Sequence, residues 1–183
     1  MLKKTICLNI FILFIAAGVA QAQVSITYSS RGKQHFTMTI PDDWRVNVGS
    51  EADPSQTPED EKESPRLISA MPNNGVPLWF GMWVPEDLEK IKGAEEYMAS
   101  LGLDLLDDLV ITERKPDAWN SVEVYYVSGT GKKEGESMDF HAVFFQLSPE
   151  SVAIAIYIGP PDTTKTHGEE LVRMIHSLQP VME

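Results

Sequence analysis

The chain has 183 residues and a formal net charge of −12 at neutral pH, because 27 acidic side chains outnumber 15 basic ones. This balance argues against a partner made of nucleic acid and against binding to anionic membrane surfaces, since both select basic patches. The 43% of hydrophobic residues is typical of a chain that folds around its own core.

The N-terminus has the features of a cleavable secretory signal. Two lysines precede an apolar stretch over residues 6–19, and residues 20–22 (Ala-Gln-Ala) match the small-x-small pattern that signal peptidase recognises. The apolar stretch is shorter than the roughly 20 residues that span a bilayer. The sequence therefore predicts a signal peptide over 1–22 and a single domain over 23–183. We expect a periplasmic or extracellular protein with no membrane span after cleavage.

Removal of the signal also removes the only cysteine, Cys7. The remaining domain can form no disulfide, and thiolate chemistry and cysteine-bound metals are excluded from it. Its formal charge becomes −14, because two lysines and no acid are lost.

One segment differs in composition from the rest. Residues 51–65 (EADPSQTPEDEKESP) carry six acids, three prolines and no large apolar side chain. Such a segment buries too little surface to offset the entropy of ordering it, so we predict a disordered acidic loop. The alternative of a calcium loop would need a D-x-D-x-D-G pattern, which is absent.

Periodicity predicts mostly strands, taken here in chain order. Residues 24–29 and 34–40 alternate as half-buried strands do, and 66–71, 78–84, 109–115 and 122–128 are further strand candidates. Residues 138–147 and 152–158 form a predicted hairpin around Ser148-Pro149-Glu150. Helical spacing places one apolar stripe in a helix that starts at Gly93, at Ala94, Tyr97, Met98, Leu101 and Leu105, and another in a closing helix, at Leu171, Met174, Ile175 and Leu178.

The strand at 152–158 is apolar on both faces, since Val152, Ile154, Ile156 and Ile158 alternate with Ala153, Ala155 and Tyr157. This pattern is typical of a central strand covered on both sides. Runs of strands with two separate helices indicate an α+β fold, which we expect to be an antiparallel β-sheet flanked by helices on both faces.

Two segments resemble the PsbP-like family, which includes the extrinsic protein of the photosynthetic oxygen-evolving complex, the nuclear Ran-release factor and DcrB-type bacterial periplasmic proteins. Residues 36–44 (FTMTIPDDW) are similar to the opening strand of that family with its Pro-x-x-Trp. Residues 171–178 (LVRMIHSL) are similar to its closing helix. The resemblance implies a non-catalytic, partner-binding domain, and it carries no functional residue over to this chain.

The strongest candidate for a binding surface is Trp79-Phe80-Gly81-Met82-Trp83. In a strand, Trp79 and Trp83 share one face with only Gly81 between them, which would form a slot for a flat ligand, a sugar ring or a partner's side chain. The alternative is that a helix packs across the glycine and the two indoles belong to the core.

A second candidate is polar. His141 lies two residues from Asp139 in a predicted strand, so both side chains emerge on one face, and Glu123 on a neighbouring strand could add a third group. This set would suit a metal-dependent hydrolase centred on His141. The alternative is a histidine at the edge of the core, because Val143, Phe145 and Leu147 follow on the same face.

No catalytic motif, metal-binding spacing or cofactor signature is present in the sequence. Gly129-Thr130-Gly131-Lys132 lacks the spacing of a phosphate loop, and we expect a glycine-rich hairpin connection there. The sequence thus favours an exported, non-catalytic domain that binds a protein partner in the cell envelope. A small-ligand carrier that uses the Trp79/Trp83 face and a hydrolase centred on His141 are the alternatives.

Overall fold

The computed structural model describes residues 22–49, 66–100, 105–119 and 121–181. The predicted signal peptide, apart from Ala22, and the predicted acidic loop at 51–65 therefore lie outside the described residues. None of the helices in these ranges is both long and apolar enough to cross a membrane.

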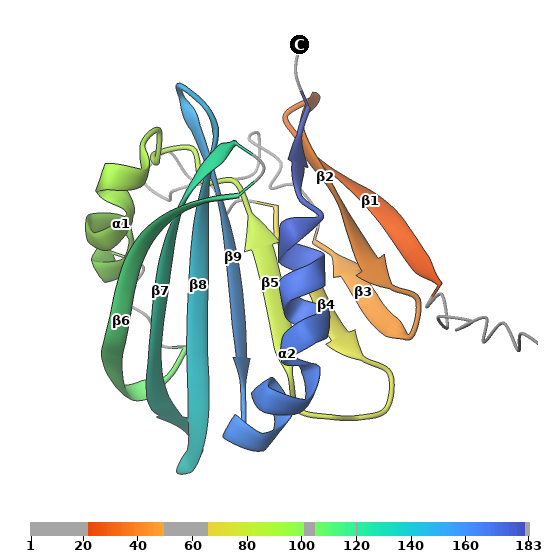
Figure 1. Cartoon of the computed structure of the whole chain (residues 1–183), viewed down its shortest axis with the longest axis vertical. Helices are drawn as coiled ribbons and strands as arrows, with labels where there is room; N and C mark the ends of the chain where they lie inside the picture. Colours follow the sequence, from red (N-terminus) through yellow and green to blue (C-terminus); the bar gives the residue numbers. More distant parts are fainter. Residues whose placement is uncertain (1–21, 50–65, 101–104, 120, 182–183) are drawn as a thin grey trace, which may run out of the picture.

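A seven-stranded sheet forms most of the molecule (Figure 1). Its spatial order is β3-β4-β5-β9-β8-β7-β6, and all neighbours pair antiparallel. The strands are β3 (Trp44–Val48), β4 (Ile68–Pro72), β5 (Trp79–Trp83), β6 (Asp107–Trp119), β7 (Val122–Lys133), β8 (Glu136–Ser148) and β9 (Ser151–Gly159).

A smaller sheet contains β1 (Gln23–Ser30), β2 (Lys33–Pro41) and the two-residue strand β10 (Gln179–Pro180), in the order β1-β2-β10. The tight turn between β1 and β2 consists of Arg31 and Gly32, which both have positive φ. Tyr28 of β1 and Phe36 of β2 are buried in the common core of the protein. Their rings stack with centroids 5.0 Å apart.

Two α-helices and one short 3₁₀ helix complete the fold. The 3₁₀ helix η1 (Ile91–Gly93) leads into α1 (Ala94–Ser100), and α2 is the longer helix Pro161–His176. The predicted stripe of the first helix is only partly confirmed, because Leu101 lies outside the described residues and Leu105 lies in a turn. Helix α2 starts without a side-chain cap, since the backbone carbonyl of Pro160 accepts from Thr163 and Thr164 instead.

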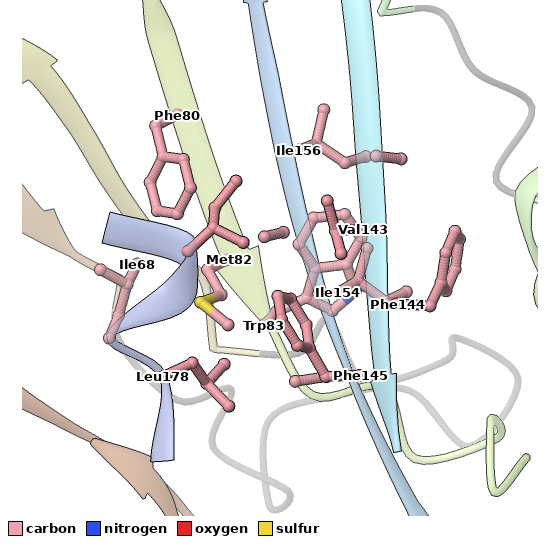
Figure 2. Packing of buried hydrophobic residues seen from close by; sticks show 14 of the residues in the cluster. Ile68, Phe80, Met82, Trp83, Val143, Phe144, Phe145, Ile154, Ile156 and Leu178 are labelled. Atoms are coloured by element: carbon pink, nitrogen blue, oxygen red, sulfur yellow. The ribbon is translucent and has the colours of Figure 1, made fainter. Parts of the chain in front are cut away.

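Strand β9 is the middle strand of the large sheet, and its residues from Val152 to Ile156 are buried on both faces. The prediction of a central strand is therefore confirmed. Figure 2 shows the packing of apolar side chains around it, where Met82 of β5 lies near Leu178 just after α2, and Phe144 and Phe145 extend from β8. This apolar core supplies the main stabilisation of a domain that has no disulfide.

Cross-strand register assigns each side chain to one of two faces, because directly paired residues point to the same side. Tyr157 pairs with His141, and His141 pairs with Ser128, so these three share one face. Helix α2 contacts this face, since Thr164 donates a hydrogen bond to Asp139 over 2.5 Å. We call it the α2 face.

The opposite face carries Trp79, Ile156 and Phe144, and α1 contacts it through Tyr97, whose hydroxyl accepts a hydrogen bond from the Trp83 indole over 3.1 Å. The structure thus confirms a mostly antiparallel fold with two helices. That the helices form complete layers over both faces stays a prediction.

Sequence periodicity was wrong about several boundaries. Strand β3 was not predicted. Gly129 and Gly131 lie inside β7 rather than in a connection, and the β7–β8 turn is Glu134-Gly135, where both residues have positive φ. Pro116 likewise lies within β6, which is an edge strand and so tolerates a proline.

Candidate functional site

A cleft of about 260 Å³ lies between α2 and the outer half of the sheet. Its floor contains Tyr126, Val143 and Tyr157 from three adjacent strands of the α2 face. We call it the α2 cleft, and its walls are Glu113, Lys115, Asp117 and Trp119 of β6 on one side and Val172, Ile175 and His176 of α2 on the other.

One end of the α2 cleft is closed by an aromatic pair. Trp119, the last residue of β6, stacks on His176 of α2 with ring centroids 4.3 Å apart and an interplanar angle of 30°. The indole also meets Phe145 of β8 edge-on at 5.9 Å. Trp119 is therefore held from below by the core and from the side by the helix, which fixes the width of the cleft here.

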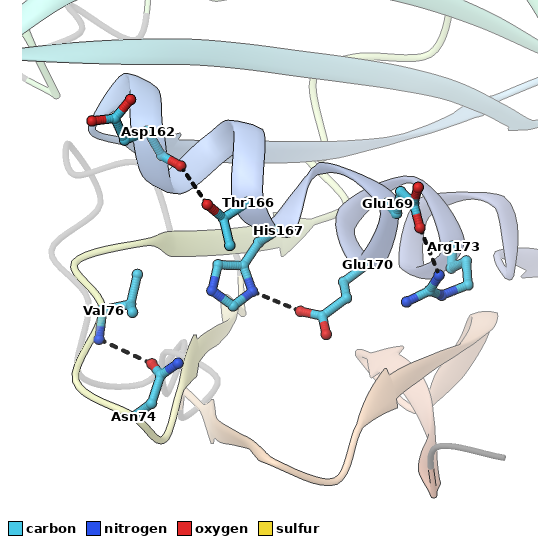
Figure 3. A network of polar contacts seen from close by, with 8 residues as sticks. All are labelled: Asn74, Val76, Asp162, Thr166, His167, Glu169, Glu170 and Arg173. Atoms are coloured by element: carbon cyan, nitrogen blue, oxygen red, sulfur yellow. Dashed lines mark hydrogen bonds and ion pairs between the residues drawn. The ribbon is translucent and has the colours of Figure 1, made fainter. Parts of the chain in front are cut away.

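The α2 side of the cleft mixes buried and exposed apolar groups. Ile175 is 5% exposed, whereas Val172, three residues earlier, is 51% exposed. Other side chains of α2 are engaged within the helix, since His167 contacts Glu170 at 2.7 Å and Arg173 contacts Glu169 at 3.7 Å (Figure 3). Val172 thus offers an uncovered apolar group at the mouth of the cleft.

The β6 wall is polar and mainly acidic. Lys115 and Asp117 form an ion pair of 3.3 Å, and the Ala118 backbone N–H donates to Asp117 over 2.9 Å. These bonds, first the backbone one and then those from the Lys115 and Trp119 side chains, lower the pKa of Asp117, which is therefore ionised at neutral pH. Within the described residues, Glu113 has no ion-pair partner.

Beside the floor lies a cluster of hydrogen-bonded polar groups. His141 stacks on Tyr157 with ring centroids 4.3 Å apart, and its Nδ1 lies 2.5 Å from the Tyr126 hydroxyl. Asp139 accepts from Thr164, which is 7% exposed in the first turns of α2. The cluster therefore ties α2 to β7, β8 and β9.

Burial favours the neutral forms of Tyr126, Tyr157 and His141 in this cluster. Burial raises the pKa of both Tyr126 and Tyr157. The neighbouring Tyr126 raises the pKa of Tyr157 further. Burial lowers the pKa of His141, and the charges of Asp139 and Glu113 oppose that shift only partly. The Tyr126 hydroxyl and His141 Nδ1 share one hydrogen bond, and the tautomer of the imidazole determines which of them donates.

The structure brings together only some of the predicted polar residues. Asp139 and His141 share the α2 face, but their hydrogen bonds go to Thr164 and Tyr126. Glu123 alternates to the opposite face of β7, so it cannot add a third group. In the part of the chain that the structure describes, no three His, Cys, Asp or Glu residues gather closely enough to hold a metal ion.

A serine that sequence analysis missed lies beside this histidine. Ser128 pairs with His141 across β7 and β8 on the same face, and it is 7% exposed. The base and the carboxylate of a serine–histidine–aspartate relay must be joined by hydrogen bonds. Among the described residues, the hydrogen bond of the His141 ring goes to Tyr126, and none joins the ring to Ser128 or Asp139.

Acidification is expected to destabilise the protein partly through His141. Its lowered folded pKa means that the unfolded chain, with a pKa near 6.5, takes up a proton first. The stability due to neutral His141 is therefore complete above about pH 6.5 and is lost as the pH falls through the folded pKa.

We expect the free energy of unfolding to fall less between about pH 7.5 and about pH 5 in His141→Phe than in the natural protein. Phenylalanine keeps the ring contact with Tyr157 and does not titrate. Urea unfolding at both pH values measures the difference, and an NMR titration of the His141 ring locates its pKa. Equal pH slopes for the two proteins would contradict this assignment.

The predicted indole slot is filled by one of its own members. The six-membered ring of Trp79 lies across Gly81, 2.1 Å from where a Cβ on that glycine would be. Trp83 is 7% exposed and its indole N–H donates to Tyr97. The expected bare backbone between two indoles is therefore absent, while Trp79 itself is half-buried. Ligand binding by Trp79, Gly81 and Trp83 stays a prediction.

Sequence analysis assigned no role to the residues that line the α2 cleft. One signal was visible, since Glu113, Lys115, Asp117 and Trp119 occur at every second position and so share a face of a strand. These residues face α2 across the cleft because of the order of the strands in the sheet. Side-chain periodicity does not reveal that order.

Two solved structures show the same fold by comparison. The solution structure of cyanobacterial PsbP (CyanoP) from Synechocystis sp. PCC 6803 matches with a TM-score of 0.61 at 8% identity, over 91% of this chain and 96% of that one. LpqN, involved in cell envelope biogenesis of Mycobacterium tuberculosis, matches with a TM-score of 0.50 at 12% identity, over 87% of this chain and 92% of that one.

No protein-family model matches the chain. No curated protein sequence matches it either. At identities this low, the two structural matches establish how the chain folds and leave its activity open. The resemblance noted in the sequence is thus supported over nearly the whole chain: the protein has a PsbP-like fold.

Proposed function

We propose that this protein is an exported, non-catalytic domain of the cell envelope that binds a protein partner through the α2 cleft. The observation that carries the proposal is the cleft itself, an open groove with aromatic, apolar and charged walls beside a half-exposed valine on α2. In this proposal α1 and α2 cover opposite faces of the sheet, as the contacts of Tyr97 and Thr164 support.

The size of the cleft favours a partner's side chains over a free small molecule. Its volume of about 260 Å³ lies below the range of about 300–1,000 Å³ that is usual for small-molecule sites. Protein interfaces commonly combine aromatic anchors with a polar rim. Trp119 and Val172 would be such anchors here, and Glu113 and Lys115 would belong to the rim.

Export is supported by the position of the first strand. Strand β1 begins at Gln23, the residue that would follow the predicted cleavage site. Cleavage there would leave the β1–β2 pairing intact, from Gln23 opposite Pro41 to Ser30 opposite Lys33. The similar LpqN is named as a protein involved in cell envelope biogenesis, which agrees with this location.

Two alternatives have less support. A small-ligand carrier that uses Trp79, Gly81 and Trp83 would need the Trp79 ring to leave Gly81. A metal-dependent hydrolase centred on His141 would need the imidazole to leave Tyr126, and Glu123 lies on the other face. Partner binding through the α2 cleft needs no rearrangement of the described residues.

The proposal is tested with Val172→Glu in a tagged full-length chain expressed in its own host. We expect the amount of partner captured from the exported fraction to fall at least about tenfold, because the substitution replaces an apolar contact with a carboxylate that loses its water on binding. Quantitative mass spectrometry measures the partner, and the intact mass of the captured chain should correspond to a start at Gln23.

Val48→Glu is the matched control. Val48 is 47% exposed, similar to Val172, but it lies on β3 at the other edge of the sheet. It should leave capture unchanged. Equal capture by both variants would contradict partner binding through the α2 cleft. A captured chain that keeps residues 1–22 would contradict export by signal cleavage.

A further inference from the structure

Deepening the proposed function, on which this inference rests, we propose that the α2 cleft receives an arginine side chain of the partner. The observation behind it is the arrangement of charges and aromatic rings in one small cleft. Carboxylates lie along one wall and aromatic rings along the floor and one end.

The charges facing the cleft are predominantly negative. Glu113 and Asp117 line it, and Asp139 lies beside its floor next to His141. Lys115 is the one lysine or arginine of the lining, and it is paired with Asp117. Glu113 is therefore left without a counter-charge among the described residues, in a protein whose formal charge is −12. A cation is the complementary ligand.

The aromatic groups select the kind of cation. Tyr126 and Tyr157 form part of the floor, and the partly exposed Trp119 lies at one end. A planar guanidinium can stack on an aromatic ring and still donate to a carboxylate, which a compact ammonium does less well. An arginine side chain can thus stack on an aromatic ring of the cleft and donate a hydrogen bond to Glu113 at the same time.

The volume limits the ligand to about one residue. A cleft of about 260 Å³ that is open to solvent along one side accepts a long side chain while its backbone stays outside. The exposed Val172 then lies where the backbone and the neighbouring side chains of the partner would pass. Charge recognition and apolar contact would thus come from adjacent parts of one peptide segment.

The test uses the ¹⁵N-labelled mature protein and the peptide acetyl-Gly-Arg-Gly-amide at concentrations up to about 10 mM, in the affinity range of single side-chain ligands. We expect the indole N–H resonance of Trp119, assigned from the spectrum of Trp119→Phe, to shift on addition of the peptide. Replacing arginine by citrulline, which has the same shape without the charge, should abolish the shift.

Glu113→Gln should raise the dissociation constant of the arginine peptide about three- to tenfold, because one charge-assisted hydrogen bond is lost. Glu123→Gln is the control, since Glu123 is also an exposed glutamate but lies on the opposite face of β7. Shifts that are equal for citrulline, that miss the cleft, or that respond equally to both variants would overturn the inference.

The failure of this inference is distinguishable from that of the proposed function. If the arginine peptide does not bind while Val172→Glu still prevents partner capture, the cleft binds a partner without an arginine. In that case only the inference about arginine is rejected. If capture is insensitive to Val172→Glu, the proposed function falls, whatever the peptide does.

Discussion

Replacing Phe145 by alanine is expected to lower the free energy of unfolding by about 3–5 kcal/mol, the usual cost of truncating a buried phenylalanine. Phe145 is 1% exposed, pairs with Val124 and Ala153 on the α2 face, and supports Trp119 at 5.9 Å. The free energy of unfolding of a domain of this size is typically only about 5–15 kcal/mol, so the variant would be close to unfolding.

Urea unfolding followed by circular dichroism measures this loss. Phe145→Leu should lower the free energy of unfolding by under about 1.5 kcal/mol, because most of the side-chain volume is kept. This variant should therefore stay folded while it loses the ring contact between residue 145 and Trp119. Val110→Ala, at a side chain that is 58% exposed, should stay within about 0.5 kcal/mol. Similar losses for Phe145→Ala and Val110→Ala would show that the α2 face is not packed as described.

Gly129→Ala has the second largest expected effect, a loss of about 1–3 kcal/mol in the free energy of unfolding, as is usual for overpacking. A Cβ at Gly129 would lie 2.3 Å from the Val110 carbonyl oxygen and 3.0 Å from Ile111 Cα. Both atoms belong to the backbone of β6, which is bulged here, so the strand itself must move.

Because β6 is one wall of the α2 cleft, Gly129→Ala should also weaken the response of Trp119 to the arginine peptide. Gly168→Ala is the matched control. Nothing lies within 4 Å of a Cβ at Gly168, which is inside α2, so alanine there should stabilise the protein by about 0.5–1 kcal/mol. Stabilisation by both substitutions would contradict the close approach of β6 to β7.

The site itself was only partly predictable. Asp139 and His141 were singled out because they lie two residues apart in a strand, and this local relation is correct. Glu123 was grouped with them, but it pairs with Ala118 of β6 and lies on the opposite face of β7, a register that the sequence does not reveal. The predicted strand ended at residue 115, whereas Pro116 and Asp117 continue the edge strand to Trp119. No local pattern reveals that an edge strand tolerates a proline at that position.

The indole pair illustrates the same limit. Alternation correctly places Trp79 and Trp83 on one face of β5. Whether the space above Gly81 stays open depends on the rotamer of Trp79, and the ring turns onto the glycine because the missing Cβ leaves room for it. A pattern of residues places side chains on a face but does not determine their rotamers.

The sequence alone was enough to predict most of the strands, the closing helix, the start of the first helix, the mostly antiparallel class and the central position of β9. These features follow from side-chain periodicity and turn residues, which act within a few residues along the chain. The α2 cleft was decided only by the tertiary structure. It joins β6 to α2, whose facing residues Trp119 and His176 are far apart in sequence. Their approach depends on strand order, on the bulges in β6 and on the packing of α2, which are all non-local.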